Sequence, residues 1–424
     1  MDTPSISFQM ARLLLRILGF QCFFAYFNPA LSGYVQRRGP TCTVSASTNG
    51  TDDAPAIIDA FRMCGNNGII HLHDPVYHIE TVMNTTGLSN VQIDLTGTML
   101  WGTNLSYWIA SGLPLGYQNA TTAWALGGDQ ILFDGHGVGT LDGNGQLWYN
   151  LADGVSNYPG RPINLLIANS TNSVYTGIRF VQSQYWTMAI KDSEDILLEG
   201  IYVNSTSNNT VPARNTDGVD TFFSNRITFR NWTVVNGDDC ISMKANSTNI
   251  LIQDSIFHGG LGVSIGSIGQ YNGVFEMIQN VTAERVLAIG SRYGGYIKTW
   301  TGISQGFPPN GGGGGLGFAT NITFRDFTLQ NVTDNVALIT QCTSFEGATG
   351  GCDTSLFQLS NITWGPGMVG SIQTDTLATM QCSGNAPCSG ISLLGFDDVV
   401  TVGAPEIKCS NVTDPIGFNC TGPT

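Results

Sequence analysis

The chain has 424 residues, of which 53 are glycine and 11% are charged, and its formal net charge is −14. Frequent glycine and sparse charge favour many turns and short strands, and they exclude a disordered chain or a coiled coil. No basic run offers a footprint for phosphates, which excludes nucleic acid as a partner but leaves room for a local cationic pocket. The length would fit two or three domains, although repeat folds do not follow that count.

Residues 1–33 are predicted to be a secretory signal peptide, followed by a single domain over residues 34–424. An apolar stretch covers residues 13–27, and small residues suited to cleavage follow at Ala30, Ser32 and Gly33. Met10 is an alternative start that gives a tidier signal. The apolar run is short and is broken by Arg16, which argues against a membrane anchor. The expected location is therefore extracellular, without membrane association after signal removal.

Sequons and cysteines support secretion independently. Asn-x-Ser/Thr sequons recur along the whole chain, for example at Asn84, Asn169, Asn246 and Asn411. Of ten cysteines, Cys22 leaves with the signal. Proximity suggests the following pairs, although spacing alone does not fix the connectivity: Cys42–Cys64, Cys342–Cys352, Cys382–Cys388 and Cys409–Cys420. Cys240 then remains unpaired, and we expect a buried, inert thiol there rather than a reactive one.

The first predicted element is a helix over residues 54–64, introduced by Thr51, Asp52 and Asp53. One face of this segment is apolar, at Ala56, Ile57, Ala60 and Phe61. Short apolar runs bounded by glycine or asparagine follow at residues 68–72, 91–95 and 130–133. A single amphipathic helix ahead of such runs is typical of a cap on a strand-rich repeat.

A repeat then becomes visible. Each unit is a strand with alternating faces, a polar corner and a second apolar strand, and the units occupy residues 195–201, 226–232, 249–255, 280–286 and 321–327. The pattern predicts an all-β, single-domain right-handed parallel β-helix whose N-terminal cap is the helix. Stacked coils of this kind bury a continuous core and present one long face suited to a polysaccharide.

Two later segments are expected to lie outside the repeat. The glycine-rich loop at 308–315 is either a surface insertion or a flap beside a cleft, since it closely follows Lys298. Beyond Cys342 the chain is rich in cysteine and glycine, which predicts a C-terminal cap held by local disulfides.

Three aspartates fall in two clusters about one coil apart. Asp217 lies in Asn215-Thr216-Asp217-Gly218, and Asp238 and Asp239 lie in Gly237-Asp238-Asp239-Cys240. On neighbouring coils, their backbones would be about 4.7–4.9 Å apart. Their carboxyl groups would then lie within several ångströms, the scale that glycoside hydrolysis requires. An isolated Asp beside Gly is more often a turn residue, and it is the set of three that favours catalysis.

These motifs, with the 259–267 loop and Ile297-Lys298 in the same order, resemble glycoside hydrolase family 28, the polygalacturonase family. The 137–148 segment is similar to an early coil of that family, so the resemblance covers most of the mature chain. It implies a right-handed β-helix enzyme that cleaves pectin backbones with inversion.

The resemblance also implies roles for individual residues. Asp238 matches the general acid, and Asp217 and Asp239 match the pair that positions and deprotonates the attacking water. Candidate substrate-binding residues are Asn215, Lys244, Tyr296 and Lys298. Crowded carboxyls would raise one pKa by like-charge repulsion, leaving that group protonated as the acid.

The sequence departs from the family pattern at three positions. Leu261 stands where the family has a histidine that assists the acid, and Tyr296 stands where it has an arginine that holds a uronate carboxylate. Phe257 lies near the usual partner of the cysteine after the Asp pair, which leaves Cys240 alone. His258 and Arg292 are candidates for compensation, although ordinary loop roles are the simpler interpretation for both.

The departures disfavour an ordinary endo-polygalacturonase. The 262–271 segment looks more like the exo-acting members, and we expect release of terminal galacturonic acid from polygalacturonate. A rhamnogalacturonan rhamnohydrolase is the alternative, because terminal rhamnose carries no carboxylate. Alternatives of other classes are a non-catalytic pectin-binding β-helix protein and a calcium-dependent pectate lyase. The histidines show no ligand spacing, so neither a metal nor a cofactor is expected, and the protein is expected to be a monomer.

Overall fold

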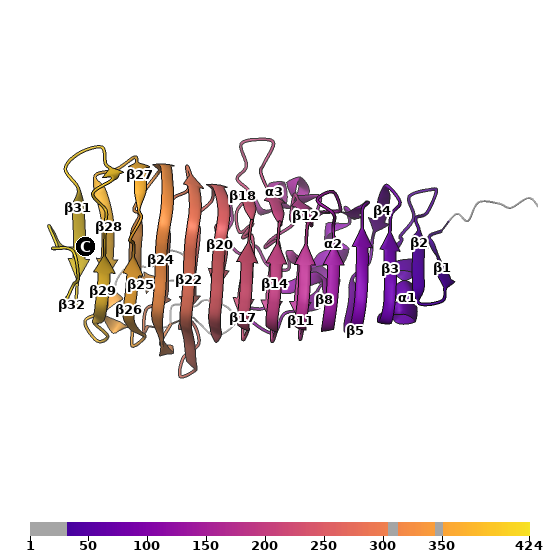
Figure 1. Cartoon of the computed structure of the whole chain (residues 1–424), viewed down its shortest axis with the longest axis horizontal. Helices are drawn as coiled ribbons and strands as arrows, with labels where there is room; N and C mark the ends of the chain where they lie inside the picture. Colours follow the sequence, from indigo (N-terminus) through magenta and orange to yellow (C-terminus); the bar gives the residue numbers. More distant parts are fainter. Residues whose placement is uncertain (1–31, 304–312, 344–350) are drawn as a thin grey trace, which may run out of the picture.

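The computed structural model describes residues 32–303, 313–343 and 351–424. These residues form one long solenoid of mainly parallel strands, with the first and last coils at opposite ends (Figure 1). The predicted right-handed parallel β-helix is confirmed. The predicted signal peptide lies almost wholly outside the described residues, as does most of the glycine-rich loop at 308–315, so the structure tests neither prediction.

Strands of successive coils lie in three parallel stacks. The first stack contains β5 (Met83–Leu95), β8 (Thr121–Asp134), β10 (Pro162–Ala168), β13 (Met188–Lys191), β16 (Asp220–Phe222), β19 (Asp239–Met243), β21 (Gly262–Ile268), β23 (Gly295–Trp300), β25 (Ala337–Thr343), β28 (Thr376–Gln381) and β31 (Glu406–Ser410). The second contains β2 (Thr41–Ser45), β3 (Asn66–Leu72), β5, β8, β11 (Thr171–Thr176), β14 (Glu194–Glu199), β17 (Asn225–Arg230), β20 (Ser247–Gly259), β22 (Phe275–Ile289), β24 (Leu316–Val332), β26 (Gln358–Trp364), β29 (Cys388–Leu393) and β32 (Val412–Thr413). The third contains β4 (Val76–Ile79), β6 (Thr98–Trp101), β9 (Thr140–Asp142), β12 (Arg179–Val181), β15 (Tyr202–Asn204), β18 (Thr233–Asn236), β20, β22, β24, β27 (Val369–Ile372) and β30 (Val399–Val400).

The core consists of columns of side chains that stack along the solenoid axis. One column in the first stack is, in register, Ile167, Ile190, Thr221, Met243, Ile265, Ile297, Ile339 and Met380. All of its members are buried. Because side chains alternate between the two faces of a strand, the residues flanking this column point outward. The outward set includes Asp220, Ser242, Tyr296 and Lys298, which brings polar groups together on the outer face.

In the later units of the sequence repeat, the polar corners are bends within long strands. Asp254 in β20 and Asp326 in β24 have φ values of 55° and 57°. This left-handed conformation is unfavourable for most L-residues, but the short polar side chains of Asp and Asn tolerate it. Each such residue lets one strand turn from the second stack into the third. The strand–corner–strand pattern of the sequence therefore has a simple backbone cause.

The N-terminal end is closed by the predicted helix. α1 spans Ala54–Cys64, and its buried face includes Ile57, Ala60 and Phe61. β1 (Tyr34–Arg38) lies antiparallel to β2 at the same end. All four predicted disulfides are present: Cys42–Cys64, Cys342–Cys352, Cys382–Cys388 and Cys409–Cys420. Cys240 is free and buried, as expected.

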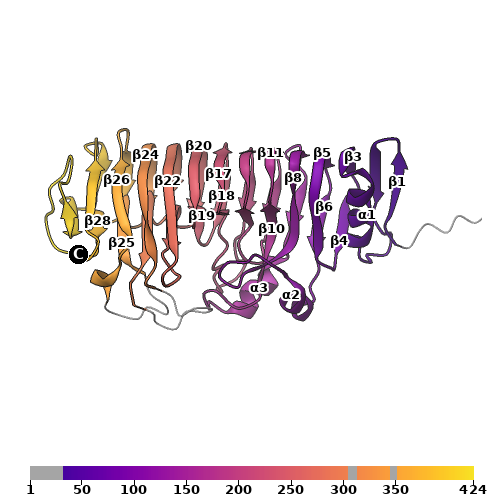
Figure 2. The same cartoon turned by 90° about the horizontal axis from the view of Figure 1, so that it is seen from below.

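Four further short elements lie outside the three stacks. α2 (Leu105–Ser111) and α3 (Gly145–Ala152) lie on one side of the solenoid near β10 (Figure 2). β7 (Leu113–Pro114) pairs antiparallel with β8, and the 3-10 helix η2 (Cys352–Thr354) follows β25. Within the described ranges, none of the helices has the length and apolar character needed to cross a membrane.

Candidate active site

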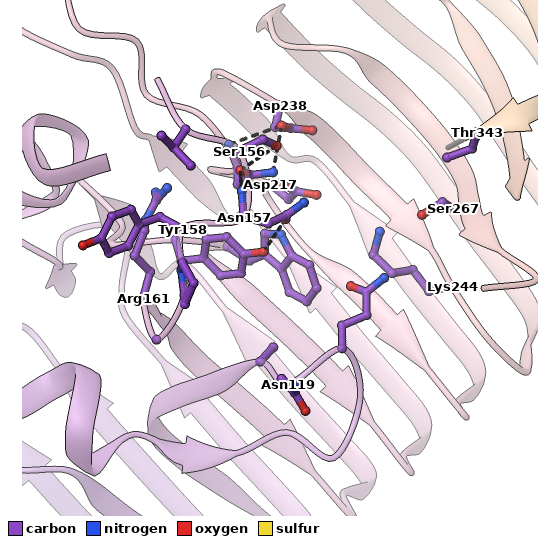
Figure 3. Close-up of a pocket in the computed structure, with 18 of the residues that line it drawn as sticks. Asn119, Ser156, Asn157, Tyr158, Arg161, Asp217, Asp238, Lys244, Ser267 and Thr343 are labelled. Carbon is purple, nitrogen blue, oxygen red and sulfur yellow. Dashed lines mark hydrogen bonds between the residues drawn. The ribbon is translucent and has the colours of Figure 1, made fainter. Parts of the chain in front are cut away.

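A cavity of about 780 Å³ lies against the outer face of the first stack (Figure 3). The coils of the stack contribute Asp217, Asp238 and Lys298 to its floor. Two connecting segments form its walls, residues 118–120 and 155–161. Figure 3 shows Asp217 and Asp238 pointing into this space, with Arg161 on one side and Lys244 on the other. Five of the seven predicted site residues line the cavity, and the other two, Tyr296 and Asp239, lie behind Lys298 and accept hydrogen bonds from it.

Backbone register explains why the aspartates meet. The amide of Thr187 donates to the carbonyl of Asp217 over 2.7 Å, and the amide of Gly218 donates to the carbonyl of Asp239 over 2.9 Å. Asp217 and Asp239 therefore lie on neighbouring coils, as predicted. A Cβ at Gly218 would lie 2.3 Å from the carbonyl of Cys240, so only glycine permits this approach. One carboxylate oxygen from each of Asp217, Asp238 and Asp239 lies within 4.8 Å of the others.

Asp239 is held in its charged form. The hydroxyl of Tyr296 donates to its Oδ1, and Lys298 Nζ donates to its Oδ2 over 2.9 Å. Lys298 Nζ also donates to the Tyr296 hydroxyl over 3.0 Å. Burial opposes the charge, but the nearby Lys298 and Lys244 ammonium groups and the hydrogen bonds outweigh it and lower the pKa of Asp239. Asp239 is thus a buried carboxylate with its counter-charge already in place.

Asp238 has its pKa shifted in the opposite direction from that of Asp239. Its Oδ2 accepts from the amide of Asn215 over 3.2 Å, and its Oδ1 accepts from the amide of Asp239 over 2.9 Å. Burial, followed by the negative charge of Asp239, raises the pKa of Asp238 above its ordinary value. A carboxyl group that keeps its proton beside an ionised neighbour is suited to donate that proton.

Asp217 is the most deeply buried member of the cluster that faces the cavity. Its side chain is 3% exposed, and Oδ1 has no hydrogen-bond partner among the described residues. Burial first, and then the charges of Asp238, Asp220 and Asp239, raise the pKa of Asp217 well above its ordinary value. An unpartnered buried oxygen beside the cavity is available to a water or a substrate hydroxyl.

Lys244 is part of a second buried pair. Its Nζ lies 3.1 Å from Asp220 Oδ1, donates to the carbonyl of Gly266 over 3.3 Å, and sits 5.4 Å from the ring centroid of Trp186. Burial raises the pKa of Asp220 to about 6, against the opposing effect of Lys244. The positive charge of Lys244 is therefore balanced locally, as is that of Lys298.

Arg161 also lines the cavity, although no sequence motif pointed to it. It lies in the irregular segment between α3 and β10, and its guanidinium donates to the carbonyls of Gln184 and Arg214 over 2.8 and 2.9 Å. It also stacks on Tyr185, 5.1 Å from the ring centroid. Nη1 has no partner among the described residues. Arg161 differs from the two cavity lysines because, within the part of the chain that the structure describes, no acidic side chain forms an ion pair with it.

Two of the three departures from the family pattern are at Leu261 and Phe257, and the structure places them differently. Leu261 lines the cavity, whereas Phe257 is fully buried in the core. Burial raises the pKa of the Cys240 thiol, which keeps it protonated and inert. His258 and Arg292 are not among the residues that line the cavity, and Arg292 pairs instead with Asp334 at 3.3 Å. The proposed compensation by either residue therefore lacks the geometry it needs.

The three aspartates are also close enough to hold a divalent cation. Lys298 already supplies a positive charge to Asp239 there, and the set contains oxygen ligands only. The arrangement has no need of a cation to balance its charge.

A parallel β-helix with acid and base carboxyls beside a cavity of this size belongs to the class of carbohydrate-cleaving hydrolases. The family model Glycosyl hydrolases family 28 matches residues 80–420. The chain belongs to this family, and it is a glycoside hydrolase.

Individual proteins are similar to this chain over most of its length. The alpha-L-rhamnosidase rgxB of Aspergillus niger is 44% identical over 421 residues, which covers 97% of each chain. Exopolygalacturonase X-1 of Emericella nidulans is 33% identical and covers 92% of this chain and 90% of its own. Among solved structures, the endo-xylogalacturonan hydrolase from Aspergillus tubingensis superposes with a TM-score of 0.77 at 25% identity, covering 90% of this chain and 99% of that one.

Proposed function

We propose that this protein is a secreted, exo-acting pectin hydrolase that releases terminal L-rhamnose from rhamnogalacturonan. The observation that carries the proposal is the opposite tendency of two adjacent carboxyls, Asp238 toward the protonated form and Asp239 toward the ionised form. Asp238 donates a proton to the departing glycosidic oxygen. Asp239 accepts a proton from the attacking water, and the free Oδ1 of Asp217 orients that water.

In an inverting reaction, water attacks the anomeric carbon from the side opposite the leaving group. Inverting enzymes usually hold their carboxyls about 6.5–9.5 Å apart, so that a water fits between base and sugar. Here one oxygen from each carboxylate lies within 4.8 Å of the others, which is a limit between single atoms and not between whole carboxyl groups. The anomeric form of the released sugar therefore tests the inverting mechanism directly.

Exo action is supported by the walls of the cavity. The amide of Gln118 donates to the hydroxyl of Tyr271 over 2.8 Å, and Tyr117 donates to Glu276 over 3.1 Å. This wall therefore reaches the edge of the first stack at which β21 ends. At the other edge, the amide of Asn157 donates to Asn215 Oδ1 over 2.7 Å, just ahead of β16. A volume of about 780 Å³ enclosed in this way suits the end of a sugar chain better than its middle.

The balance of charge favours a neutral terminal sugar. Lys298 pairs with Asp239, and Lys244 pairs with Asp220. The hydroxyl of Tyr296 already donates to Asp239, and a phenol cannot bind a carboxylate in the bidentate way that arginine does. Rhamnose carries no carboxylate, so its binding requires no free cationic group from these residues. The 44% identical Aspergillus niger relative, a rhamnosidase by name, supports the same choice over the galacturonic acid that the sequence placed first.

Galacturonic acid is the second candidate, and Arg161 is the observation that favours it. Its Nη1 has no partner among the described residues, so it is available to a carboxylate. In rhamnogalacturonan, that carboxylate would belong to the galacturonate next to the rhamnose. In polygalacturonate, it would belong to the terminal sugar, as the name of the Emericella nidulans relative suggests.

Product analysis on two substrates distinguishes these candidates. We expect free rhamnose as the sole early product from debranched rhamnogalacturonan oligomers, and no product with an Asp238→Asn variant. Free galacturonic acid from polygalacturonate, without rhamnose from the other substrate, would select the second candidate. An unsaturated product would point to elimination, and no sugar from either substrate would contradict hydrolysis of both.

A further inference from the structure

A group of histidines and acids lies on the outer side of the second stack, near the N-terminal end. His71 at the end of β3 is in register with Asp94 of β5, which is in register with Asp134 of β8. His73 and His136 follow these strands within two residues. Three of the five histidines of the chain thus meet on three consecutive coils. None of them is among the residues that line the catalytic cavity.

The distances within this group are those of a compact ligand set. His71 Nε2 lies 3.3 Å from Asp94 Oδ2, and His136 Nε2 lies 3.4 Å from Asp94 Oδ1. Single ligand atoms of His71, His73 and Asp94 lie within 4.8 Å of one another. Ligands about 2.0–2.1 Å from a tetrahedral zinc ion are about 3.3 Å apart. The contacts of His71 and His136 with Asp94 already have this length, and binding of the ion would draw the exposed His73 and His136 rings toward each other.

The surroundings hold the central carboxylate in place. Asp94 is 8% exposed, and its two oxygens accept from Gln92 Nε2 over 2.9 and 3.2 Å. His136 Nδ1 lies 3.3 Å from Asp134 Oδ2, which orients the ring and leaves Nε2 toward Asp94. Such carboxylate partners behind a ligating histidine fix its tautomer and strengthen it as a ligand.

We propose that His71, His73, His136 and Asp94 form a binding site for one divalent transition-metal ion of the zinc type. Imidazole and carboxylate ligands in a set of four suit zinc and disfavour calcium or magnesium, which prefer oxygen alone. An ion there ties three successive coils together next to the N-terminal cap. The site is remote from the cavity, so its role is structural and hydrolysis does not depend on it.

The proposed site differs from the expectation that the histidines show no ligand spacing. His71 and His73 are two residues apart, which places both on the same side of an extended chain. The missing information was the register that brings His136 and Asp94 beside them across about sixty residues of sequence.

Metal binding to the untagged mature protein tests the proposal directly. The protein is stripped with a chelator at pH 7.5 and titrated with zinc chloride in a calorimeter, and with cobalt(II) in a spectrophotometer. We expect one site per chain and the intense visible absorption of tetrahedral cobalt. His73→Asn is the main variant because His73 is exposed and its loss leaves the fold intact, and we expect at least about a tenfold loss of affinity.

His258→Asn is the matched control, since His258 lies on β20 away from the group, and its affinity should equal that of the wild type. An Asp217→Asn variant that retains full affinity excludes binding at the catalytic carboxylates. Absence of a single tight site, six-coordinate cobalt spectra, or equal affinity in His73→Asn and the wild type would overturn the proposal. All variants except Asp217→Asn should hydrolyse substrate at the wild-type rate, which separates this test from that of the proposed function.

Discussion

Replacing Tyr296 by phenylalanine removes one hydroxyl and leaves the ring in place. The ring packs on Tyr293 at a centroid distance of 4.8 Å, and the residue is 3% exposed, so the fold should tolerate the change. Burial, and then the adjacent Asp239 charge, raise the pKa of Tyr296 well above its ordinary value, so the hydroxyl is a permanent donor to Asp239. The variant therefore tests one hydrogen bond to the proposed base.

The size of the effect follows from the type of bond that is lost. A hydrogen bond to a charged group contributes about 1.5–3 kcal/mol, and 1.36 kcal/mol corresponds to a tenfold change in a proton affinity. The bond stabilises the ionised form of Asp239, so its loss raises the pKa of that carboxyl. Activity requires the ionised form, and the acidic limb of the kcat/KM profile should therefore move to higher pH by about one to two pH units.

The assay is a kcat/KM profile from pH 3 to pH 7 on rhamnogalacturonan oligomers, with Tyr293→Phe as the matched control. Tyr293 lies beside Tyr296 and is buried, yet it makes no hydrogen bond to Asp239. The control should keep the wild-type profile, and Tyr296→Phe should approach the wild-type rate above its shifted limb. An unmoved acidic limb, or an equal rate loss at every pH, would refute the assignment of Asp239 as the base held by Tyr296.

Three further changes probe other parts of the molecule. Asp217→Asn should lower kcat by at least about a hundredfold. It should not lower Tm, because it removes a buried acid whose charged form is unfavourable. A lowered Tm with normal kcat would assign Asp217 to stability instead. Arg161→Met should raise KM by about tenfold or more, because a charge-assisted contact with the substrate is lost, and kcat should change less. The control Arg292→Met lies outside the cavity and should change neither constant. Equal KM values for Arg161→Met and the wild type would exclude Arg161 from substrate binding. Ile252→Ala, at a fully buried position of β20, should lower the free energy of unfolding by about 2–5 kcal/mol in urea titrations. Ile256 lies on the same strand but is 36% exposed, so Ile256→Ala should lower it by much less. Similar losses for both variants would contradict the stacked-core description.

The architecture could be predicted because the residue pattern of each short segment agrees with the position of that segment in the fold. The helix at 54–64 has its apolar face and its end at Cys64, and the structure reproduces these bounds. The repeat units at 249–255 and 321–327 contain the corner residues Asp254 and Asp326, whose left-handed backbone turns each strand. Such features are encoded within a few residues, so no long-range information is needed to recognise them.

The site could be predicted only in part. Asp217, Asp238 and Asp239 stand in motifs whose spacing equals one coil, and the structure brings them together. The walls of the cavity depend on contacts such as Gln118 with Tyr271, which are 153 residues apart and carry no local pattern. Arg161 likewise acquires its position from the carbonyls of Gln184 and Arg214. Sequence also did not reveal that Lys244 and Lys298 are each balanced by a carboxylate, and this balance bears on the choice of sugar.

The central claim is that Asp238 and Asp239 act as acid and base in an inverting release of a terminal sugar. Real-time proton NMR of the first minutes of hydrolysis of a rhamnogalacturonan oligomer tests this claim most directly, because it identifies the sugar and its anomeric form before mutarotation. The α-linked terminal rhamnose should appear first as the β-anomer, with none formed by Asp238→Asn. Initial appearance of the α-anomer would contradict the assigned roles and would indicate a covalent intermediate on one of the carboxylates.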